Sequence, residues 1–201
     1  MIDQNFIGRK VARGEEALER VRANFGNLTV EQINWKPAKE RWSIAECLEH
    51  LLIADKCYFK DLAEISNGSY EMTFWEKYSP FSSLLGNLLK ENMKEKVKRK
   101  MVTQKMITPL PTTYDISLLS QYAANLTRFI DLVSKCAGAD LDRTIIGSPM
   151  IGWVTYSLRD ALEFLFEHEH RHINQAIEVM RDERFPKAER ENVKWESSFP
   201  R

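Results

Sequence analysis

The sequence has few of the features that mark membrane, secreted or nucleic-acid-binding proteins. No apolar run in its 201 residues approaches the roughly 20 residues that a helix needs to cross a bilayer. The first residues, Met-Ile-Asp-Gln-Asn-Phe, lack the basic and apolar regions of a secretory signal. Lysine plus arginine and aspartate plus glutamate both number 29, so no positive excess favours nucleic acid or an anionic membrane as a partner.

Cysteine is scarce, and its spacing forms no familiar motif. Cys47, Cys57 and Cys136 are an odd number, so we expect reduced, mostly buried thiols in a cytoplasmic protein. The sequence also lacks a P-loop, a dinucleotide-binding glycine pattern, a Gly-x-Ser-x-Gly elbow and the cysteines of a zinc ribbon. The sequence therefore carries none of the common signatures of nucleotide-binding proteins, serine esterases or structural zinc sites.

The sequence does contain long stretches with apolar residues at helical spacing. Steps of three and four residues predict helices over about residues 5–25, 43–66, 116–137 and 157–183. A Ser43-x-x-Glu46 capping box marks the start of the second of these helices. Because no stretch shows the alternation of a strand, we predict one all-α domain over residues 1–201, built as a four-helix bundle.

The stretch between the second and third predicted helices, residues 68–114, is a long and less regular insertion. It contains an aromatic cluster around Pro80, which predicts a packed loop or lid, and a strongly basic run over residues 88–101. The basic run could bind a phosphate or another anion, although a charged helix face is the simpler explanation.

Three of the four histidines lie close together in the last predicted helix, at His168, His170 and His172. A helix turns about 100° per residue, so residues four apart share a face and residues two apart point in opposite directions. His168 and His172 therefore continue the apolar stripe that faces inward. His170 falls on the polar side, where we expect it to be solvated.

The two inward imidazoles need partners, because burying an unpaired polar group is costly. A divalent metal ion would satisfy both, and a third ligand is then needed. His50 lies at the edge of the apolar stripe of the second predicted helix, and a bundle can bring it opposite the last helix. Three histidines with an open fourth position are typical of a catalytic zinc site. The alternative is that each inward histidine only hydrogen-bonds a carboxylate or a carbonyl group.

Several polar residues near these histidines are candidates for supporting roles. Glu46 and Gln175 could hydrogen-bond a metal-binding histidine from behind. The capping box alone also explains Glu46, and packing between helices explains Gln175. Glu49, Glu169 and Asp55 are weaker candidates for a general base or a further ligand. For Glu49 and Glu169 the simpler expectation is a solvated or half-buried carboxylate.

Two segments of the sequence resemble the signatures of a known family. Asn-Trp-Lys-Pro at residues 34–37 and Arg-Trp-Ser-Ile-Ala-Glu-Cys-Leu-Glu-His-Leu at residues 41–51 resemble the N-terminal signature of the DinB/YfiT-like metalloenzymes. His-Glu-His-Arg-His-Ile-Asn-Gln at residues 168–175 resembles their C-terminal signature. The resemblance covers about residues 5–182.

The resemblance implies an up-down-down-up four-helix bundle, often a homodimer, with a divalent metal ion held by His50, His168 and His172. We expect zinc first, with nickel or manganese as alternatives. The implied function is that of a metal-dependent enzyme acting on a small molecule, either a thiol S-transferase that uses a low-molecular-weight thiol or a hydrolase. The alternative is a non-catalytic helical bundle for binding or interaction, with a structural metal or none.

Overall fold

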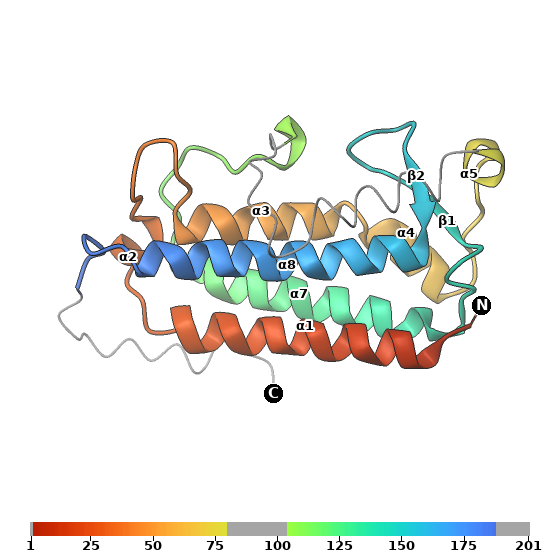
Figure 1. The fold of residues 1–201 in the computed structure, drawn as a ribbon, viewed down its shortest axis with the longest axis horizontal. Coiled ribbons are helices and arrows are strands. Elements are labelled where there is room, and N and C mark those ends of the chain that lie inside the picture. The colour runs from red at the N-terminus through yellow and green to blue at the C-terminus, as the bar shows by residue number, and fades with distance from the viewer. Residues whose placement is uncertain (1, 80–103, 188–201) are drawn as a thin grey trace.

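The computed structural model describes residues 2–79 and 104–187, and this part of the chain is mostly helical (Figure 1). The long helices are α1 (Gln4–Phe25), α3 (Ile44–Lys56), α7 (Ser117–Lys135) and α8 (Leu158–Met180). The shorter ones are α2 (Val30–Asn34), α4 (Phe59–Ser66), α5 (Phe74–Tyr78) and the 3₁₀ turns η1 (Lys105–Ile107) and η2 (Cys136–Gly138). The prediction of an all-α fold is confirmed in that the described residues are mostly helical.

The long helices lie side by side around one apolar core. α1 packs against α7 and α8, and α3 packs against the same two helices. α1 and α8 run in one direction along the long axis, whereas α3 and α7 run in the other (Figure 1). Phe25, Leu48, Phe129 and Phe166 are fully buried among them. Each long helix therefore has two helical neighbours as well as an outer face.

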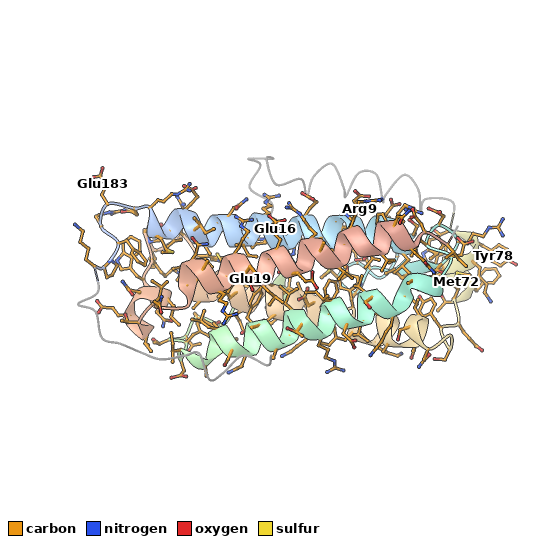
Figure 2. All side chains as sticks on the ribbon, turned by 90° about the horizontal axis from the view of Figure 1, so that it is seen from below. Arg9, Glu16, Glu19, Met72, Tyr78 and Glu183 are labelled. Carbon is orange, nitrogen blue, oxygen red and sulfur yellow. The ribbon has the colours of Figure 1, made fainter. Side chains whose placement is uncertain are left out.

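Polar side chains cover the outer face of α1, as its amphipathic sequence requires. Arg9, Glu16 and Glu19 are exposed and point away from the core (Figure 2). On the inner face, a Cβ atom at Gly14 would lie 2.6 Å from a side-chain carbon of Ile130 and 2.9 Å from one of Phe166. Glycine at this position therefore permits the close approach of α1 to α7 and α8.

Side-chain caps fix the starts of the two helices that carry the candidate site. The backbone N–H of Glu46 donates to the Ser43 hydroxyl at 3.1 Å, and the Glu46 carboxylate accepts from the Ser43 N–H at 2.8 Å. This reciprocal pair confirms the predicted capping box. Ser157 caps α8 by accepting from the N–H of Asp160 at 3.1 Å. These caps fix where α3 and α8 begin, and hence which face of each helix carries its histidines.

The helix predicted over residues 43–66 is interrupted between α3 and α4. The N–H of Cys57 donates to the Ala54 carbonyl, and that of Tyr58 donates to the Asp55 carbonyl. These three-residue steps tighten the last turn of α3 and end it. Tyr58 is then buried, with its hydroxyl 2.7 Å from that of Tyr156.

The prediction that no segment forms a strand is wrong for the connector before α8. Strand β1 (Ile145–Gly147) pairs antiparallel with β2 (Thr155–Ser157), with Ile146 opposite Tyr156. Both of these paired residues are buried. Strands of three residues are too short to show an alternating pattern in the sequence.

The aromatic cluster of the 68–114 insertion does not form a packed lid in its described part. The rings of Phe74 and Tyr78 on α5 are tilted against each other with 4.8 Å between centroids, yet they remain 79% and 69% exposed. Residues 80–103, which include the basic run, lie outside the described residues, so anion binding there stays a prediction. Within residues 2–79 and 104–187, none of the helices combines the length and the apolar character of a transmembrane span.

Candidate metal centre

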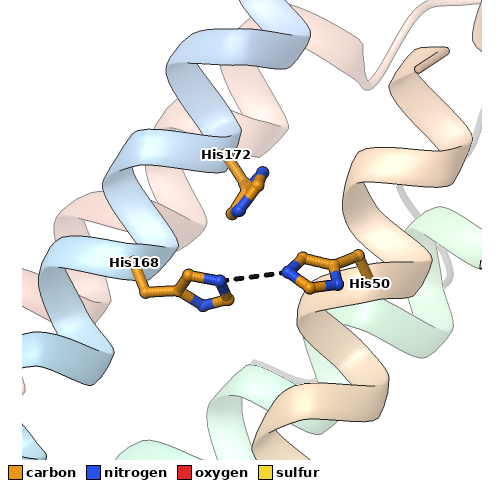
Figure 3. A group of neighbouring side chains, drawn as sticks. All are labelled: His50, His168 and His172. Atoms are coloured by element: carbon orange, nitrogen blue, oxygen red, sulfur yellow. Dashed lines mark hydrogen bonds between the residues drawn. The ribbon is translucent and has the colours of Figure 1, made fainter. Parts of the chain in front are cut away.

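Three histidine side chains from two helices converge between α3 and α8 (Figure 3). His50 comes from α3, and His168 and His172 come from α8, on one face as the helical spacing predicts. Each offers one ring nitrogen, and these three atoms lie within 4.8 Å of one another. The Nε2 atoms of His50 and His168 are 3.0 Å apart. We call these residues the histidine cluster.

The histidine cluster is buried enough to keep its imidazoles neutral. His50 is buried, and His168 and His172 are half-buried. Burial lowers the pKa of His50, and burial with the two neighbouring imidazoles holds the pKa of His168 well below its ordinary value. Burial and the nearby His50 lower the pKa of His172 to about 3. At neutral pH each ring therefore carries one proton and one lone pair.

Hydrogen bonds behind two of the rings decide which nitrogen keeps its lone pair. His50 Nδ1 lies 2.7 Å from the carbonyl oxygen of Ile107, to which it donates its proton. His172 Nδ1 donates in the same way to the Gln175 Oε1 atom at 3.0 Å. The Nε2 atoms of both rings are therefore left as acceptors, the form in which imidazole binds a metal ion.

Trp42 forms one wall of the histidine cluster. Its ring centroid lies 4.9 Å from that of His50 and 5.6 Å from that of His172. The residue directly precedes the N-cap of α3, where its sequence position predicts that it packs at the helix entry. Its contact with two histidines has no signal in the sequence, because His172 belongs to a helix far along the chain.

The predicted supporting residues differ in what they contact. Gln175 makes the contact with His172 that its predicted role requires. Glu46 accepts from the Ser43 N–H and from the Lys36 ammonium group at 2.7 Å. These contacts are those of a helix cap and a surface ion pair, so the capping explanation accounts for Glu46.

The prediction that His170 is solvated is wrong, because His170 is fully buried. Its Nε2 donates to the Arg13 carbonyl at 2.9 Å, and its Nδ1 accepts from the Arg20 guanidinium at 2.9 Å. Both partners belong to α1. Because α8 packs against α1 as well as α3, its face opposite the histidine cluster is also covered.

The prediction that Glu169 is solvated or half-buried is also wrong. Glu169 and Asp55 are each only 1% exposed, and their side chains are close enough to share a proton. The Tyr122 hydroxyl donates to Glu169 at 2.6 Å, and the Asn125 amide donates to Asp55 at 3.0 Å. Burial raises the pKa of Glu169 to about 7 and that of Asp55 well above its ordinary value. We call these four residues the carboxyl cluster.

The cysteines do not contribute an activated thiol. All three are free, and Cys47 and Cys136 are buried. Burial raises the pKa of the Cys136 thiol to about 12 and also raises that of Cys47 and Cys57. A thiolate is the nucleophilic form of cysteine, so these side chains are poor candidates for thiol chemistry.

Comparison with known families agrees with this geometry. A sequence profile of the DinB superfamily matches residues 13–176, a span that holds the whole histidine cluster. The chain belongs to the DinB superfamily. The resemblance of the two signature segments is thereby confirmed at the level of the family, and the cluster of this DinB superfamily protein could hold a divalent metal ion. No curated protein and no solved structure matches the chain.

Proposed function

We propose that this DinB superfamily protein is a metal-dependent enzyme whose divalent ion is held by His50, His168 and His172. The observation that carries the proposal is the convergence of three ring nitrogens within 4.8 Å. Nitrogen atoms around one tetrahedral zinc ion lie about 3.3 Å apart, given zinc–nitrogen bonds of about 2.0–2.1 Å. The 3.0 Å between the Nε2 atoms of His50 and His168 is close to that spacing.

The donor set favours a borderline metal ion over a hard one. Neutral imidazole suits zinc and nickel, whereas magnesium and calcium prefer oxygen ligands. We therefore expect zinc first and nickel second. Manganese is a weaker candidate, because oxygen ligands also suit it best.

The protein around the cluster would orient the ligands and leave room for a small-molecule substrate. The Ile107 carbonyl and Gln175 hold two imidazoles in the metal-binding tautomer. Trp42 presents an aromatic wall, and the partial exposure of His168 and His172 leaves the cluster accessible. When bound, the ion would supply a Lewis acid that lowers the pKa of water to near 7 or stabilises a substrate thiolate. The proposed reaction is accordingly hydrolysis or transfer of a low-molecular-weight thiol.

We also propose that residues 1–201 form one up-down-down-up four-helix bundle that acts in the cytoplasm, as a homodimer. The contacts of α1 and α3 with both α7 and α8, and the directions of the four helices in Figure 1, support the bundle. The dimer rests on the family resemblance, and the location rests on the reduced cysteines that the sequence predicts.

Metal content tests the proposal directly. After loading with zinc and gel filtration, mass spectrometry should find one equivalent of zinc in the wild-type protein and none in His172→Ala. His170→Gln is the matched control, because His170 lies in the same helix but faces α1, and it should retain zinc. An unchanged zinc content in His172→Ala would show that the ligand assignment is wrong.

A second measurement separates the enzyme from a structural metal site. If the metal is catalytic, a chelator should abolish turnover of thiol-transfer or ester substrates, and added metal should restore it. A large loss of thermal stability on chelation, with no turnover of any substrate in the metal-replete protein, would favour the non-catalytic bundle.

A further inference from the structure

The connector that precedes α7, residues 104–116, reaches the histidine cluster through its backbone. It begins near the 3₁₀ turn η1, and the Ile107 carbonyl at the end of that turn accepts from His50 Nδ1 at 2.7 Å. The Ile107 side chain is buried, whereas Met106 and Leu110 are more than half exposed. We propose that the 104–116 connector positions His50, and that Asn34 is the residue that holds the connector in place.

Asn34 binds the connector as a neighbouring strand would. Its Nδ2 donates to the Tyr114 carbonyl at 2.8 Å, and its Oδ1 accepts from the Tyr114 N–H at 2.8 Å. The same Nδ2 donates to the Val30 carbonyl at 2.7 Å, which fixes the side chain to its own helix. Because α2 packs against α3, Asn34 attaches the connector to the structural unit that carries His50.

The connector is stiff enough to carry this attachment from Tyr114 to Ile107. Pro109 and Pro111 lie between them, and proline fixes the backbone angle φ. The Tyr114 hydroxyl donates to the Leu110 carbonyl at 3.0 Å and closes the connector on itself. The position of Tyr114 therefore constrains the position of the Ile107 carbonyl.

Among the described residues, the Ile107 carbonyl is the group that accepts the proton of the outer nitrogen of His50. It sets the tautomer and the orientation of the ring, and no side-chain substitution at Ile107 can remove it. Loss of such an outer partner typically lowers metal affinity 10–100-fold. Asn34 is the point at which one substitution should release the carbonyl without touching a metal ligand.

The first test compares Asn34→Ala with Gln32→Ala, a matched control in the same short helix. The Gln32 amide ties α2 to the Pro186 carbonyl at 2.8 Å, and the side chain also completes the capping box of α2. Its removal should disturb α2 at least as much. Zinc affinity should fall about 10-fold in Asn34→Ala and stay within about twofold in Gln32→Ala. Equal affinities in the two variants would overturn the proposal.

The second test needs no metal. The zinc-affinity test rests on the proposed function, whereas this one examines the positioning of His50 by itself. Imidazole nitrogen NMR of the metal-free protein should show His50 as the Nδ1–H tautomer, with a proton that exchanges slowly with water. In Asn34→Ala the proton should exchange faster and the Nε2–H tautomer should appear, whereas Gln32→Ala should match the wild type. An unchanged His50 signal in Asn34→Ala would overturn the proposal, even if zinc binds.

Asn34→Asp keeps the inference testable if Asn34→Ala does not fold. Aspartate keeps an acceptor for the Tyr114 N–H but loses the donor to the Tyr114 carbonyl. The exchange rate of the His50 proton should therefore be intermediate, and a wild-type rate would count against the proposal. If neither the wild type nor any variant binds zinc but the tautomer still responds to Asn34, the positioning role stands and the proposed metal site fails.

Discussion

α3 and α8 carry two buried polar clusters that differ in what completes them. The carboxyl cluster has a hydrogen-bond donor from α7 on each acid, Tyr122 for Glu169 and Asn125 for Asp55. In the histidine cluster, the known donors point outward, to Ile107 and Gln175. The Nε2 atoms of His50 and His172 are acceptors, and His50 Nε2 lies 3.0 Å from His168 Nε2, so either the proton of His168 or a cation lies between these two nitrogens.

This difference indicates which cluster is a ligand site. In the carboxyl cluster, a proton shared between the two acids and the donors of α7 offset the buried charge within the protein, and Glu169 Oε1 and Asn125 Oδ1 are left without a hydrogen-bond partner among the described residues. The histidine cluster directs the Nε2 lone pairs of His50 and His172 toward its centre, and it is partly exposed, so an external cation can reach it. We therefore expect zinc to stabilise the protein through the histidine cluster alone. Substitutions in the carboxyl cluster should lower stability without loss of metal, and the two clusters should change stability in opposite directions with pH.

The largest expected effect is stabilisation by zinc through the histidine cluster. At a zinc concentration 100 times its Kd, the free energy of unfolding should rise by about 2.7 kcal/mol. For a chain of this size the Tm should then rise by about 5–10 °C. Thermal melts followed by circular dichroism should show this rise in the wild type and in Tyr122→Phe, and not in His168→Ala. A full rise in His168→Ala would contradict the assignment.

A comparable loss of stability, without any loss of metal, should follow removal of a donor from the carboxyl cluster. Tyr122→Phe leaves a buried oxygen of Glu169 without its donor, which should lower the free energy of unfolding by about 1.5–3 kcal/mol. Urea denaturation of the metal-free protein measures this loss, and zinc titration should give an unchanged stoichiometry. Loss of zinc in Tyr122→Phe would show that the clusters are not separate.

A smaller effect is expected when the ligand orientation is loosened. Gln175→Ala removes the acceptor behind His172 and should lower zinc affinity about 10-fold, or about 1.4 kcal/mol. Competition with a chromophoric chelator measures the affinity. Glu178→Gln, an exposed position on the same helix, is the control and should bind zinc as the wild type does. An affinity in Gln175→Ala equal to that of the control would show that Gln175 only packs between helices.

The smallest net effect is expected in the pH dependence of stability in the metal-free protein. The two clusters change the free energy of unfolding in opposite directions as the pH changes, so their contributions partly cancel. His172 has a pKa of about 3 when folded and 6.5 in its ordinary state, so the unfolded chain binds more protons between these values. Its contribution to stability therefore falls as the pH drops through that range. Glu169 has a pKa of about 7 when folded against an ordinary 4.5, so its contribution falls as the pH rises.

Variants should separate these opposite slopes. Glu169→Gln removes the contribution of Glu169 and leaves those of the histidines and of Asp55, so stability should rise more steeply from pH 4.5 to pH 7 than in the wild type. In His172→Ala the rise should be flatter or reversed. Urea midpoints measured at several pH values test both, and identical slopes in the three proteins would contradict the assigned pKa shifts.

The sequence predicts the helices and the histidine cluster better than the surroundings of either. Apolar spacing and the Ser43 cap locate α3, and a four-residue step puts His168 and His172 on one face. The same spacing says only that His170 points the other way. It cannot say that α1 covers that face, so the burial of His170 requires the tertiary structure.

Two further features have no signal in the sequence for physical reasons. A donor from Tyr122 on α7 stabilises the buried Glu169, and a single sequence does not pair distant residues. The partner of His50 is the backbone carbonyl of Ile107, a group that every residue has. The convergence of the three histidines was therefore predictable from residue types and helical spacing, whereas their supports depended on how the segments pack.

The most direct test of the account is anomalous diffraction at the zinc edge from crystals of the zinc-loaded protein. We expect one strong peak about 2.0–2.1 Å from a ring nitrogen of each of His50, His168 and His172, and none at Asp55 and Glu169. A peak at the carboxyl cluster, or a histidine cluster without one, would contradict the central claim.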